Sequence, residues 1–366
     1  MLETVNDVLQ VFDTAGNPMA SPTALNGFCG YVPAIDRTKT PLEFGPELTD
    51  PSCLFDRDDT QRWFHVVLTL DRVNNLTQAL AGTNHLDTAV SMTSNPLDAW
   101  NVYSIPVQDG GTQGTPDHHC TLGTNPAHGP CLGDNPHIGA DTNGFYITTN
   151  EYNFVSPGFH GAQIYAMSKH QLPAGASSIA VVQFDTADTS LGVQLDGHPG
   201  FTVWPAVSTA ESEDDDNGKE FFLSSEAVFQ ITGTDNRLRL WTMQNTESLD
   251  GIPALQLRTR AVNTIFYSVP PRSNQKPGDV PLAQCLSDSM LPVTPNLTGS
   301  WRLVVGGTGP FPNTEKVVDS NDSRMQQVVL ANGKLCCARH RVVDRGRANN
   351  QGGYSLFCYQ SEFWQG

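Results

Sequence analysis

The sequence lacks the features that mark membrane-spanning and helical proteins. It contains no uninterrupted apolar run of about eighteen residues, the length that a membrane-spanning helix needs. Stretches with the period of a long amphipathic helix are scarce. The N-terminus has neither the basic nor the apolar region of a signal peptide, so we expect a mature or trimmed form of the chain. These absences predict a protein without helical layers that does not insert into a membrane.

Positive charge is also scarce. The chain carries 21 Lys and Arg residues against 38 Asp and Glu residues, which gives a net charge of −17. A surface of this sign repels the phosphates of nucleic acids and the anionic face of a membrane. We therefore expect no nucleic-acid partner.

Two common catalytic signatures are missing as well. No Gly-X-Ser-X-Gly elbow is present, and the glycine-rich stretch Val304–Pro312 lacks the Lys-Ser/Thr of a phosphate-binding loop. These absences exclude hydrolases of the nucleophile-elbow type and argue against nucleotide chemistry.

The chain is instead rich in turn-forming residues, with 32 Gly and 25 Pro distributed along its length. Such a distribution is typical of many short strands joined by tight turns. The Asn143-Gly144 and Asn332-Gly333 pairs are strong hairpin signals. The sequence therefore predicts an all-β protein.

An internal repeat gives the most informative signal. Four segments share an acidic or polar start, a short strand, a polar turn and a second strand that opens with aromatic or apolar residues. They are Asp50–Leu68, Asp134–Asn150, Phe201–Ser225 and Asp322–Ala338. Their spacing suits a β-propeller of four-stranded blades.

We expect one propeller domain over residues 1–366 with six blades, approximately 1–45, 46–130, 131–195, 196–260, 261–315 and 316–366. The last blade is expected to be incomplete or closed by strands from both termini. A β-sandwich or jelly roll is the alternative, because alternating strands and Asn-Gly turns also describe those folds.

Eight cysteines, an even number, suggest an oxidising compartment. Cys120 and Cys131 bracket a loop short enough for one disulfide, and Cys29 with Cys53 is a second predicted pair. The connectivity of the other four is left open; these are Cys285, Cys336, Cys337 and Cys358.

The segment Ala89–Ile105, AVSMTSNPLDAWNVYSI, resembles a degenerate Asp-box, the hairpin motif of sialidase-like propellers. Thr93, Asn95 and Trp100 hold its hydroxyl, Asx and Trp places, whereas Leu97 and Ala99 depart from its Gly and Thr. With the repeated segments, most of the chain resembles a family of secreted proteins with sialidase-like, neuraminidase-superfamily propellers. The resemblance implies that fold and an extracellular location, but no particular reaction.

A sialidase needs arginines for the substrate carboxylate, a tyrosine activated by a glutamate, and an acid/base aspartate. The candidates for those roles are Asp134, Arg324, Glu151, Tyr152 and Asp50. None lies in a diagnostic motif, and acidic residues that recur in several blades are more often solvated strand ends or ion pairs between blades.

Metal binding gives two further hypotheses. Calcium could be held by oxygen ligands; the candidates are Asp134, Asp141, Asn143, Asp214 and Asp216. A transition metal could be held by His118, His119 and His128 in the loop between Cys120 and Cys131 and beside it. Calcium is the cofactor that we expect if there is one, and solvated loops are the simpler interpretation of both groups.

Together these observations predict a secreted, disulfide-containing propeller that binds a glycan or an extracellular protein, or assembles with copies of itself, without catalysis. The alternative is a carbohydrate-active enzyme, a glycoside hydrolase or polysaccharide lyase, with an axial pocket. The two differ in whether a bound glycan is cleaved.

Overall fold

The computed structural model describes residues 1–122, 125–156, 158–208, 218–270, 321–343 and 351–360; the side chains of 122, 125–128, 339–343 and 351–360 lie outside that description. Within these ranges nearly all regular structure is β-strand. The one α-helix, α1 (Leu25–Phe28), has four residues, so no described helix is long and apolar enough to cross a membrane. The all-β fold expected from the sequence is confirmed.

Most strands form antiparallel sheets in which consecutive strands are neighbours. The first such sheet has four strands in the order β4-β5-β6-β7. They are β4 (Glu47–Asp56), β5 (Arg62–Arg72), β6 (Leu80–Ser91) and β7 (Trp100–Pro106).

The second and third sheets repeat this order, as β13-β12-β11-β10 and β14-β15-β16-β17. Their strands are β10 (Cys131–Ala140), β11 (Gly144–Asn153), β12 (Phe159–Ser168), β13 (Val182–Asp185), β14 (Trp204–Ser208), β15 (Lys219–Ser225), β16 (Thr234–Gln244) and β17 (Gln256–Ser268). A fourth sheet contains β18 (Met325–Ala331), β19 (Lys334–Val343) and β20 (Gln351–Gln360).

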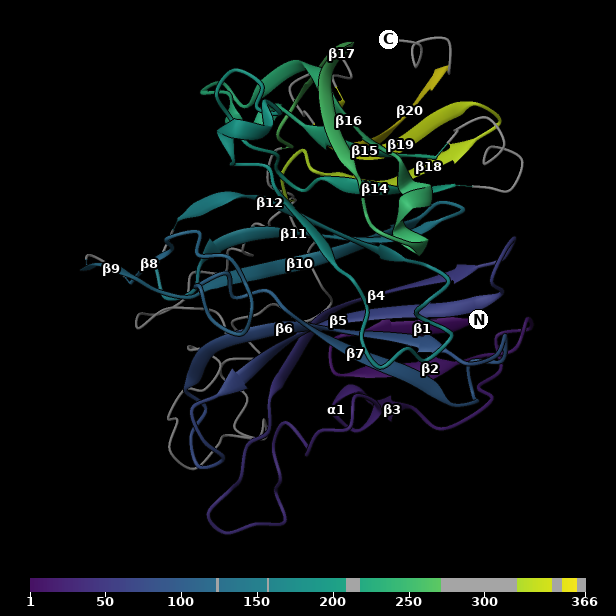
Figure 1. Ribbon diagram of the computed structural model, residues 1–366, viewed down its shortest axis with the longest axis vertical. Coiled ribbons are helices and arrows are strands. Elements are labelled where there is room, and N and C mark those ends of the chain that lie inside the picture. The colour runs from purple at the N-terminus through teal and green to yellow at the C-terminus, as the bar shows by residue number, and fades with distance from the viewer. Residues whose placement is uncertain (123–124, 157, 209–217, 271–320, 344–350, 361–366) are drawn as a thin grey trace, which may run out of the picture.

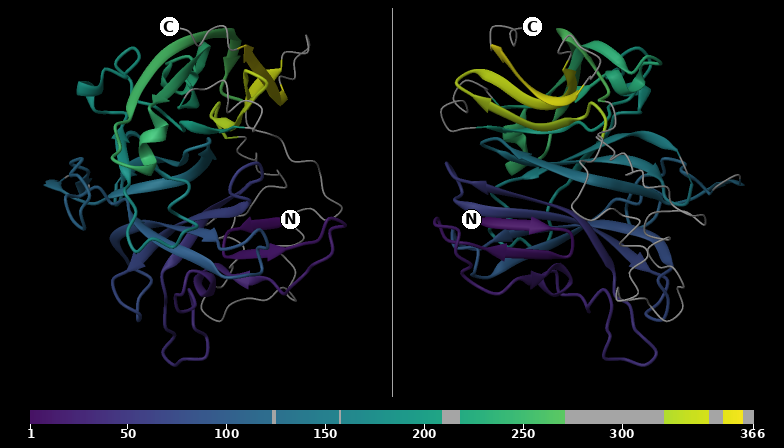
Figure 2. Two further views of the ribbon diagram at one scale, coloured as in Figure 1. Left: turned by 45° about the vertical axis from the view of Figure 1, so that its right-hand side comes forward. Right: turned by 180° about the vertical axis from the view of Figure 1, so that it is seen from behind.

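The first strands of successive sheets lie side by side. β10 pairs with β14 in parallel through Ala140 and Val207, and β14 pairs with β18 in parallel through Ala206 and Val328. The sheets therefore follow one another along the molecule, as Figures 1 and 2 show from several sides. Four-stranded meanders joined at their first strands are the blades of a β-propeller. This arrangement confirms the propeller-type fold; the number of blades stays a prediction.

Each repeated segment identified in the sequence is the first hairpin of a sheet: β4-β5, β10-β11, β14-β15 and β18-β19. The repeated hairpins also share an irregularity in strand register. The register of β4 against β5 shifts between Thr49 and Ser52, and that of β10 against β11 shifts between Asp134 and His137. The Asn332-Gly333 turn between β18 and β19 has positive φ at both residues, as a two-residue hairpin requires.

Apolar side chains fill the space between neighbouring sheets. Phe64 of the first sheet stacks on Phe145 of the second, with 4.7 Å between ring centroids. Tyr146 of the second sheet meets Phe222 of the third, in a cluster that also contains Trp241. Each fully buried side chain of this kind contributes about 1.5–3 kcal/mol to folding. Packing between neighbouring sheets thus holds the strand ends of one sheet in place relative to those of the next.

The N-terminal residues form a small sheet of β1 (Leu2–Val5), β2 (Val8–Val11) and β3 (Thr23–Ala24). Its strands pair with one another and not with β20, so the alternative in which N-terminal strands complete the last blade is not found in the described pairings. The sheet packs beside β4, where Leu2 and Leu48 share an apolar cluster. Short 3-10 turns in the described part of the chain span Thr189–Leu191, Ala227–Phe229 and Thr246–Asp250.

The disulfide predictions are half right. Cys120 and Cys131 are bonded, and the bridge encloses the hairpin of β8 (Thr121–Leu122) and β9 (Asn125–His128). The Cys29–Cys53 pair is wrong, because both residues are free thiols that pack in the apolar cluster under the N-terminal sheet. Burial raises the pKa of Cys29 to about 12 and that of Cys53 to about 11, so both behave as small apolar side chains.

Among the remaining cysteines, Cys336 is disulfide-bonded. The side chains of Cys285 and Cys358 lie outside the described residues. The Asp-box-like segment forms the turn between β6 and β7, where Asp98 accepts hydrogen bonds from Thr93 Oγ1 at 2.6 Å and Asn95 Nδ2 at 3.0 Å.

Candidate functional site

Four of the five residues proposed from the sequence for sialidase-like chemistry come together where the first strands begin. Asp50 and Asp134 lie near the starts of β4 and β10, and Arg324 directly precedes β18. The negative charge of Asp50 and the positive charge of Arg324 both act on the pKa of Asp134, and all of Asp134, Arg324 and Asp322 act on that of Tyr152. The propeller arrangement brings these strand starts together, although they are far apart in the sequence.

A row of half-buried aromatic side chains continues this group. Tyr152 and Phe159 have ring centroids 5.4 Å apart, and Phe159 is again 5.4 Å from Phe201. Phe229 lies 6.3 Å from both Phe159 and Phe201 and stacks on His198 at 4.8 Å. We call the whole group the strand-start surface; its members are Asp50, Asp134, Tyr152, Phe159, His198, Phe201, Phe229, Asp322 and Arg324.

The charges on the strand-start surface are predominantly negative. Asp322 accepts hydrogen bonds from Nε and Nη2 of Arg324 at 2.9 and 2.8 Å, and the guanidinium lies 5.3 Å from the centroid of the Phe201 ring. Burial and the charge of Asp50 raise the pKa of Asp134, and Arg324 only partly opposes them. The strand-start surface therefore contains three carboxyl groups and one guanidinium.

The fifth candidate, Glu151, belongs to a different group. Its carboxylate is 1% exposed, and both oxygens lie 3.0 Å from Nδ1 of His118. Asp109, with a fully buried side chain, approaches the same Nδ1 to 3.6 Å. We call these three residues the acid–histidine cluster. His118 was a metal candidate from the sequence and Glu151 a catalytic one, whereas Asp109 was missed.

Two glutamines hold the carboxylates of the acid–histidine cluster. Gln183 Nε2 on β13 donates to Asp109 Oδ2 at 2.8 Å, and Gln163 Nε2 on β12 donates to Glu151 Oε2 at 3.3 Å. Gln183 also donates to Gln163 Oε1 at 3.1 Å, which joins the two amides. The segment before Cys120 is thereby attached to the outer strands of the second sheet.

Burial and mutual charge shift the ionisation of this cluster. Burial and the neighbouring charge of Glu151 raise the pKa of Asp109 well above that of an ordinary carboxyl group. Burial alone would lower the pKa of His118, but its hydrogen bond to Glu151 and the two negative charges raise it instead. The cluster therefore holds protons at pH values where exposed groups of these types have lost them.

Part of this arrangement recurs in the other sheets. A buried polar pair joins the second and third strands of the first three sheets: Thr69 with Asp87 at 2.7 Å, Glu151 with Gln163 at 3.3 Å, and Glu226, directly after β15, with Arg239 at 2.8 Å. The three pairs occupy the same register. In each pair, the residue directly opposite the third-strand member lies two positions before the other member of the pair. These pairs are a structural device of the repeat, so Asp109 and His118 are the additions specific to the second sheet.

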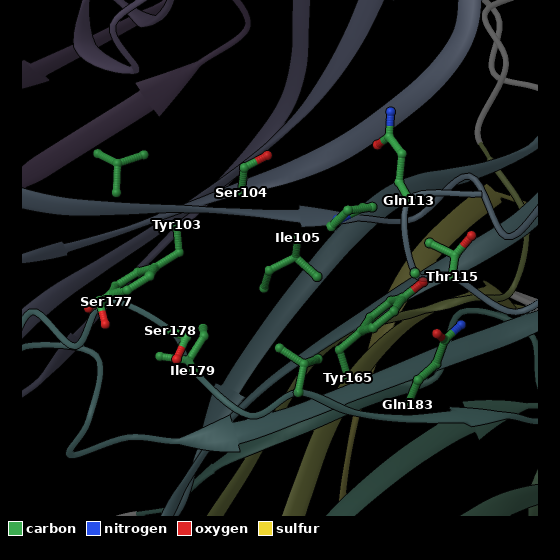
Figure 3. Close-up of a pocket in the computed structure, with 14 residues that line it drawn as sticks. Tyr103, Ser104, Ile105, Gln113, Thr115, Tyr165, Ser177, Ser178, Ile179 and Gln183 are labelled. Carbon is green, nitrogen blue, oxygen red and sulfur yellow. The ribbon is translucent and has the colours of Figure 1, made fainter. Parts of the chain in front are cut away.

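A pocket of about 500 Å³ opens beside the acid–histidine cluster. Tyr103 of β7, Tyr165 of β12, and the amides of Gln113 and Gln183 surround it, as Figure 3 shows. Gln183 thus lines the pocket and also hydrogen bonds Asp109. The side chain of Tyr165 is almost fully buried where it lines the pocket.

His119, the neighbouring histidine candidate, does not join His118 in the cluster. The side chain of His119 is 64% exposed, with Nδ1 3.2 Å from Asp117. The side chain of His128 lies outside the described residues. His137, which belongs to the same sequence region, is buried and stacks on Trp204 with ring centroids 3.8 Å apart.

The calcium candidates within the described residues do not form one group. Asp134 lies near the start of β10 and Asp141 directly after its end, about 20 Å along an extended strand. Asp141 accepts hydrogen bonds from the backbone of Asn143 and Gly144 and from the Tyr146 hydroxyl, so its oxygens stabilise the β10-β11 turn. Asp214 and Asp216 lie outside the described residues.

Sequence reasoning missed Asp109 and the three phenylalanines that join Tyr152 in the aromatic row. Asp109 lies between Gln108 and Gly110 in a loop whose pattern resembles no ligand motif. Phe201 was noted only as the start of a repeated segment, and Phe229 follows a strand without any distinguishing neighbour. No signal in the sequence points to either group, because both depend on which sheets are neighbours.

Comparison with known proteins gives structural likenesses only. No protein-family model matches the chain, and no curated protein sequence matches it. A glycosyl hydrolase from Bacteroides ovatus is similar over 86% of this chain and 67% of its own, with 8% identity and a TM-score of 0.38. A subtype N11 neuraminidase-like protein of A/flat-faced bat/Peru/033/2010 (H18N11) is similar over 98% of this chain and 68% of its own, with 8% identity and a TM-score of 0.39.

Proposed function

We propose that this protein is an extracellular β-propeller that binds an uncharged glycan on the strand-start surface and does not cleave it. The observation that supports this most directly is the continuous row of half-buried rings Tyr152, Phe159, Phe201 and Phe229 beside the polar groups of Asp134 and Arg324. Binding sites for small ligands combine aromatic faces with a few placed polar groups. The apolar faces of sugar rings pack on such aromatics, and the hydroxyls hydrogen bond to carboxylates and guanidinium groups.

The charge of the surface favours an uncharged ligand. Arg324 already donates two hydrogen bonds to Asp322, and Asp50 and Asp134 add further acidic groups. An incoming carboxylate would meet repulsion from these groups as well as from a chain of net charge −17. Neutral hexose or N-acetylhexosamine polymers fit this surface better than acidic sugars.

The buried Cys120–Cys131 disulfide supports an extracellular location, since such bonds persist in oxidising compartments. Secretion is a part of the proposal, and it is tested by locating the protein in fractionated cultures of its source.

The proposed binding is tested by screening the full chain against immobilised neutral and acidic glycans. We expect saturable binding to a neutral glycan, and we expect Phe201→Ala to reduce affinity at least tenfold. Phe266→Ala is the matched control, because this phenylalanine is 73% exposed on β17 and is not a member of the strand-start surface. Equal losses in both variants, or binding restricted to acidic glycans, would contradict the proposal.

A second function, glycan hydrolysis, is favoured by one observation. Asp134 is half-buried and its pKa is raised by burial and by Asp50, which are properties of a general acid with a second carboxylate nearby. If this alternative holds, the glycan that binds is also cleaved, and Asp134→Asn abolishes product release while binding persists. Binding without any reducing-end release over long incubation supports the binding protein instead.

A further inference from the structure

The acid–histidine cluster brings three metal-binding side chains to one place. The ligand atoms of Asp109, His118 and Glu151 all lie within 4.8 Å of one another, and His118 Nδ1 is 3.0 Å from Glu151 and 3.6 Å from Asp109. Ligands about 2.1 Å from a tetrahedral zinc ion are roughly 3.4 Å apart. The distances between these atoms therefore match a metal site after shifts of a few tenths of an ångström.

One further atom at this position is buried and lacks a partner. Asp109 Oδ1 has no hydrogen-bond partner among the described residues, and the Asp109 side chain is fully buried. Leaving a buried polar atom unsatisfied is costly, and a bound cation would give it a favourable neighbour.

The glutamine contacts also have the form expected around a metal. One oxygen of each carboxylate accepts a hydrogen bond from an amide, Asp109 Oδ2 from Gln183 and Glu151 Oε2 from Gln163. Such outer hydrogen bonds orient the ligands of metal sites and raise their affinity. Asp109 Oδ2, the oxygen 3.6 Å from His118 Nδ1, keeps a second lone pair for an ion, and Glu151 Oε1 accepts no amide hydrogen bond from the described residues.

We propose that Asp109, His118 and Glu151 bind one divalent transition-metal ion, with Zn²⁺ as the preferred ion. Two carboxylates and one imidazole are a ligand set for zinc or manganese, whereas calcium and magnesium favour oxygen ligands alone. Three protein ligands leave a fourth position of a tetrahedral ion for water. Cys120 and Cys131 also lie beside Glu151, but their sulfurs are in a disulfide and do not serve as ligands.

The ion would join two parts of the chain. Asp109 and His118 come from the segment that precedes Cys120, and Glu151 comes from β11 of the second sheet. Metal binding to the folded form alone stabilises the fold, so zinc should fix this segment against the sheet and against the edge of the pocket. The site does not overlap the strand-start surface and is independent of the glycan proposal.

The test uses the untagged full chain, stripped of metal by a chelator and titrated with Zn²⁺ by calorimetry. We expect one equivalent of Zn²⁺ to bind and the melting temperature to rise. Co²⁺ should bind at the same place and give visible d–d absorption, a readout that does not depend on stability. His118→Gln and Asp109→Asn should abolish stoichiometric binding, and Gln163→Leu should weaken it about 10- to 100-fold.

His119→Ala is the matched control, because this histidine is the exposed neighbour of His118. It should bind Zn²⁺ as tightly as the unaltered chain. Circular dichroism of each variant shows whether it is folded. The His118 side chain is partly exposed, so His118→Gln is the substitution expected to disturb folding least. The proposal is overturned if the folded chain takes up neither Zn²⁺ nor Co²⁺, if His118→Gln binds as well as His119→Ala, or if Ca²⁺ binds equally well.

Discussion

Glu151 and Tyr152 are consecutive residues of β11, yet each belongs to a different candidate site. Glu151 contacts His118 in the acid–histidine cluster, whereas Tyr152 packs on Phe159 in the strand-start surface. Successive side chains of a strand point to opposite faces of the sheet, which separates the two groups over a single peptide bond. The second sheet is therefore the element to which both proposals are attached.

Two buried histidines predict a loss of stability in mild acid. Burial lowers the pKa of His65 to about 4 and that of His137 to about 3, against about 6.5 for a histidine in an unfolded chain. Below pH 6.5 the unfolded chain binds protons that the folded chain does not, so stability falls as the pH decreases towards 4. Each histidine contributes a slope of about 1.4 kcal/mol per pH unit.

The measurement is urea unfolding at several pH values between 4 and 7. His137→Gln should reduce the change in the free energy of unfolding with pH by the contribution of one histidine, because glutamine does not titrate. His119→Ala, which removes an exposed histidine, is measured in the same way for comparison. A slope that His137→Gln does not alter would show that this residue is protonated in the folded state.

The buried ion pair of Glu226 and Arg239 predicts a strong coupling. Arg239 is fully buried, donates to Glu226 Oε2 at 2.8 Å, and also donates to the carbonyl of His198 at 2.9 Å. Arg239→Met alone leaves a buried carboxylate without its partner and should cost about 3–5 kcal/mol. The double variant Glu226→Leu/Arg239→Met should recover most of that loss. A double-mutant cycle with a coupling near zero would contradict this account.

The Cys120–Cys131 bridge predicts a defined gain in stability. It closes a loop with a sequence separation of 11, for which chain-entropy arguments give about 3 kcal/mol. Replacing both cysteines by serine should lower the free energy of unfolding by that amount and speed amide exchange in the adjoining segment around His118. Unchanged unfolding of the double variant would mean that burial of the hairpin, and not the bond, holds this segment.

The close contact of the second and third sheets is tested at Gly139. A Cβ atom there would lie 2.2 Å from the carbonyl oxygen of Ala206 and 2.7 Å from Pro205, so β10 and β14 would have to separate. Gly139→Ala should therefore cost about 1–3 kcal/mol. Gly27→Ala is the control, since nothing lies within 4 Å of its Cβ position, and it should be neutral or stabilising. Similar effects of both substitutions in denaturant unfolding would contradict the parallel pairing of these strands.

The sequence by itself determined the local structure. Gly, Pro and Asn-Gly turns predicted short strands, and the four repeated segments predicted the four first hairpins, because turn chemistry and strand alternation act over a few residues. It also indicated the Cys120–Cys131 bridge, whose ends are close in the chain. It failed for Cys29 and Cys53, since spacing alone does not show whether two thiols meet or pack separately in an apolar cluster.

Only the tertiary structure decided which side chains share a site. Asp109 meets Glu151, and Phe201 meets Phe159, because sheets and loops distant in the sequence pack together, and no local pattern encodes such contacts. Asp50, Asp134 and Arg324 were individually visible as starts of repeated units. Their convergence required the parallel alignment of first strands, which is fixed by packing between sheets and not by the propensity of any one segment.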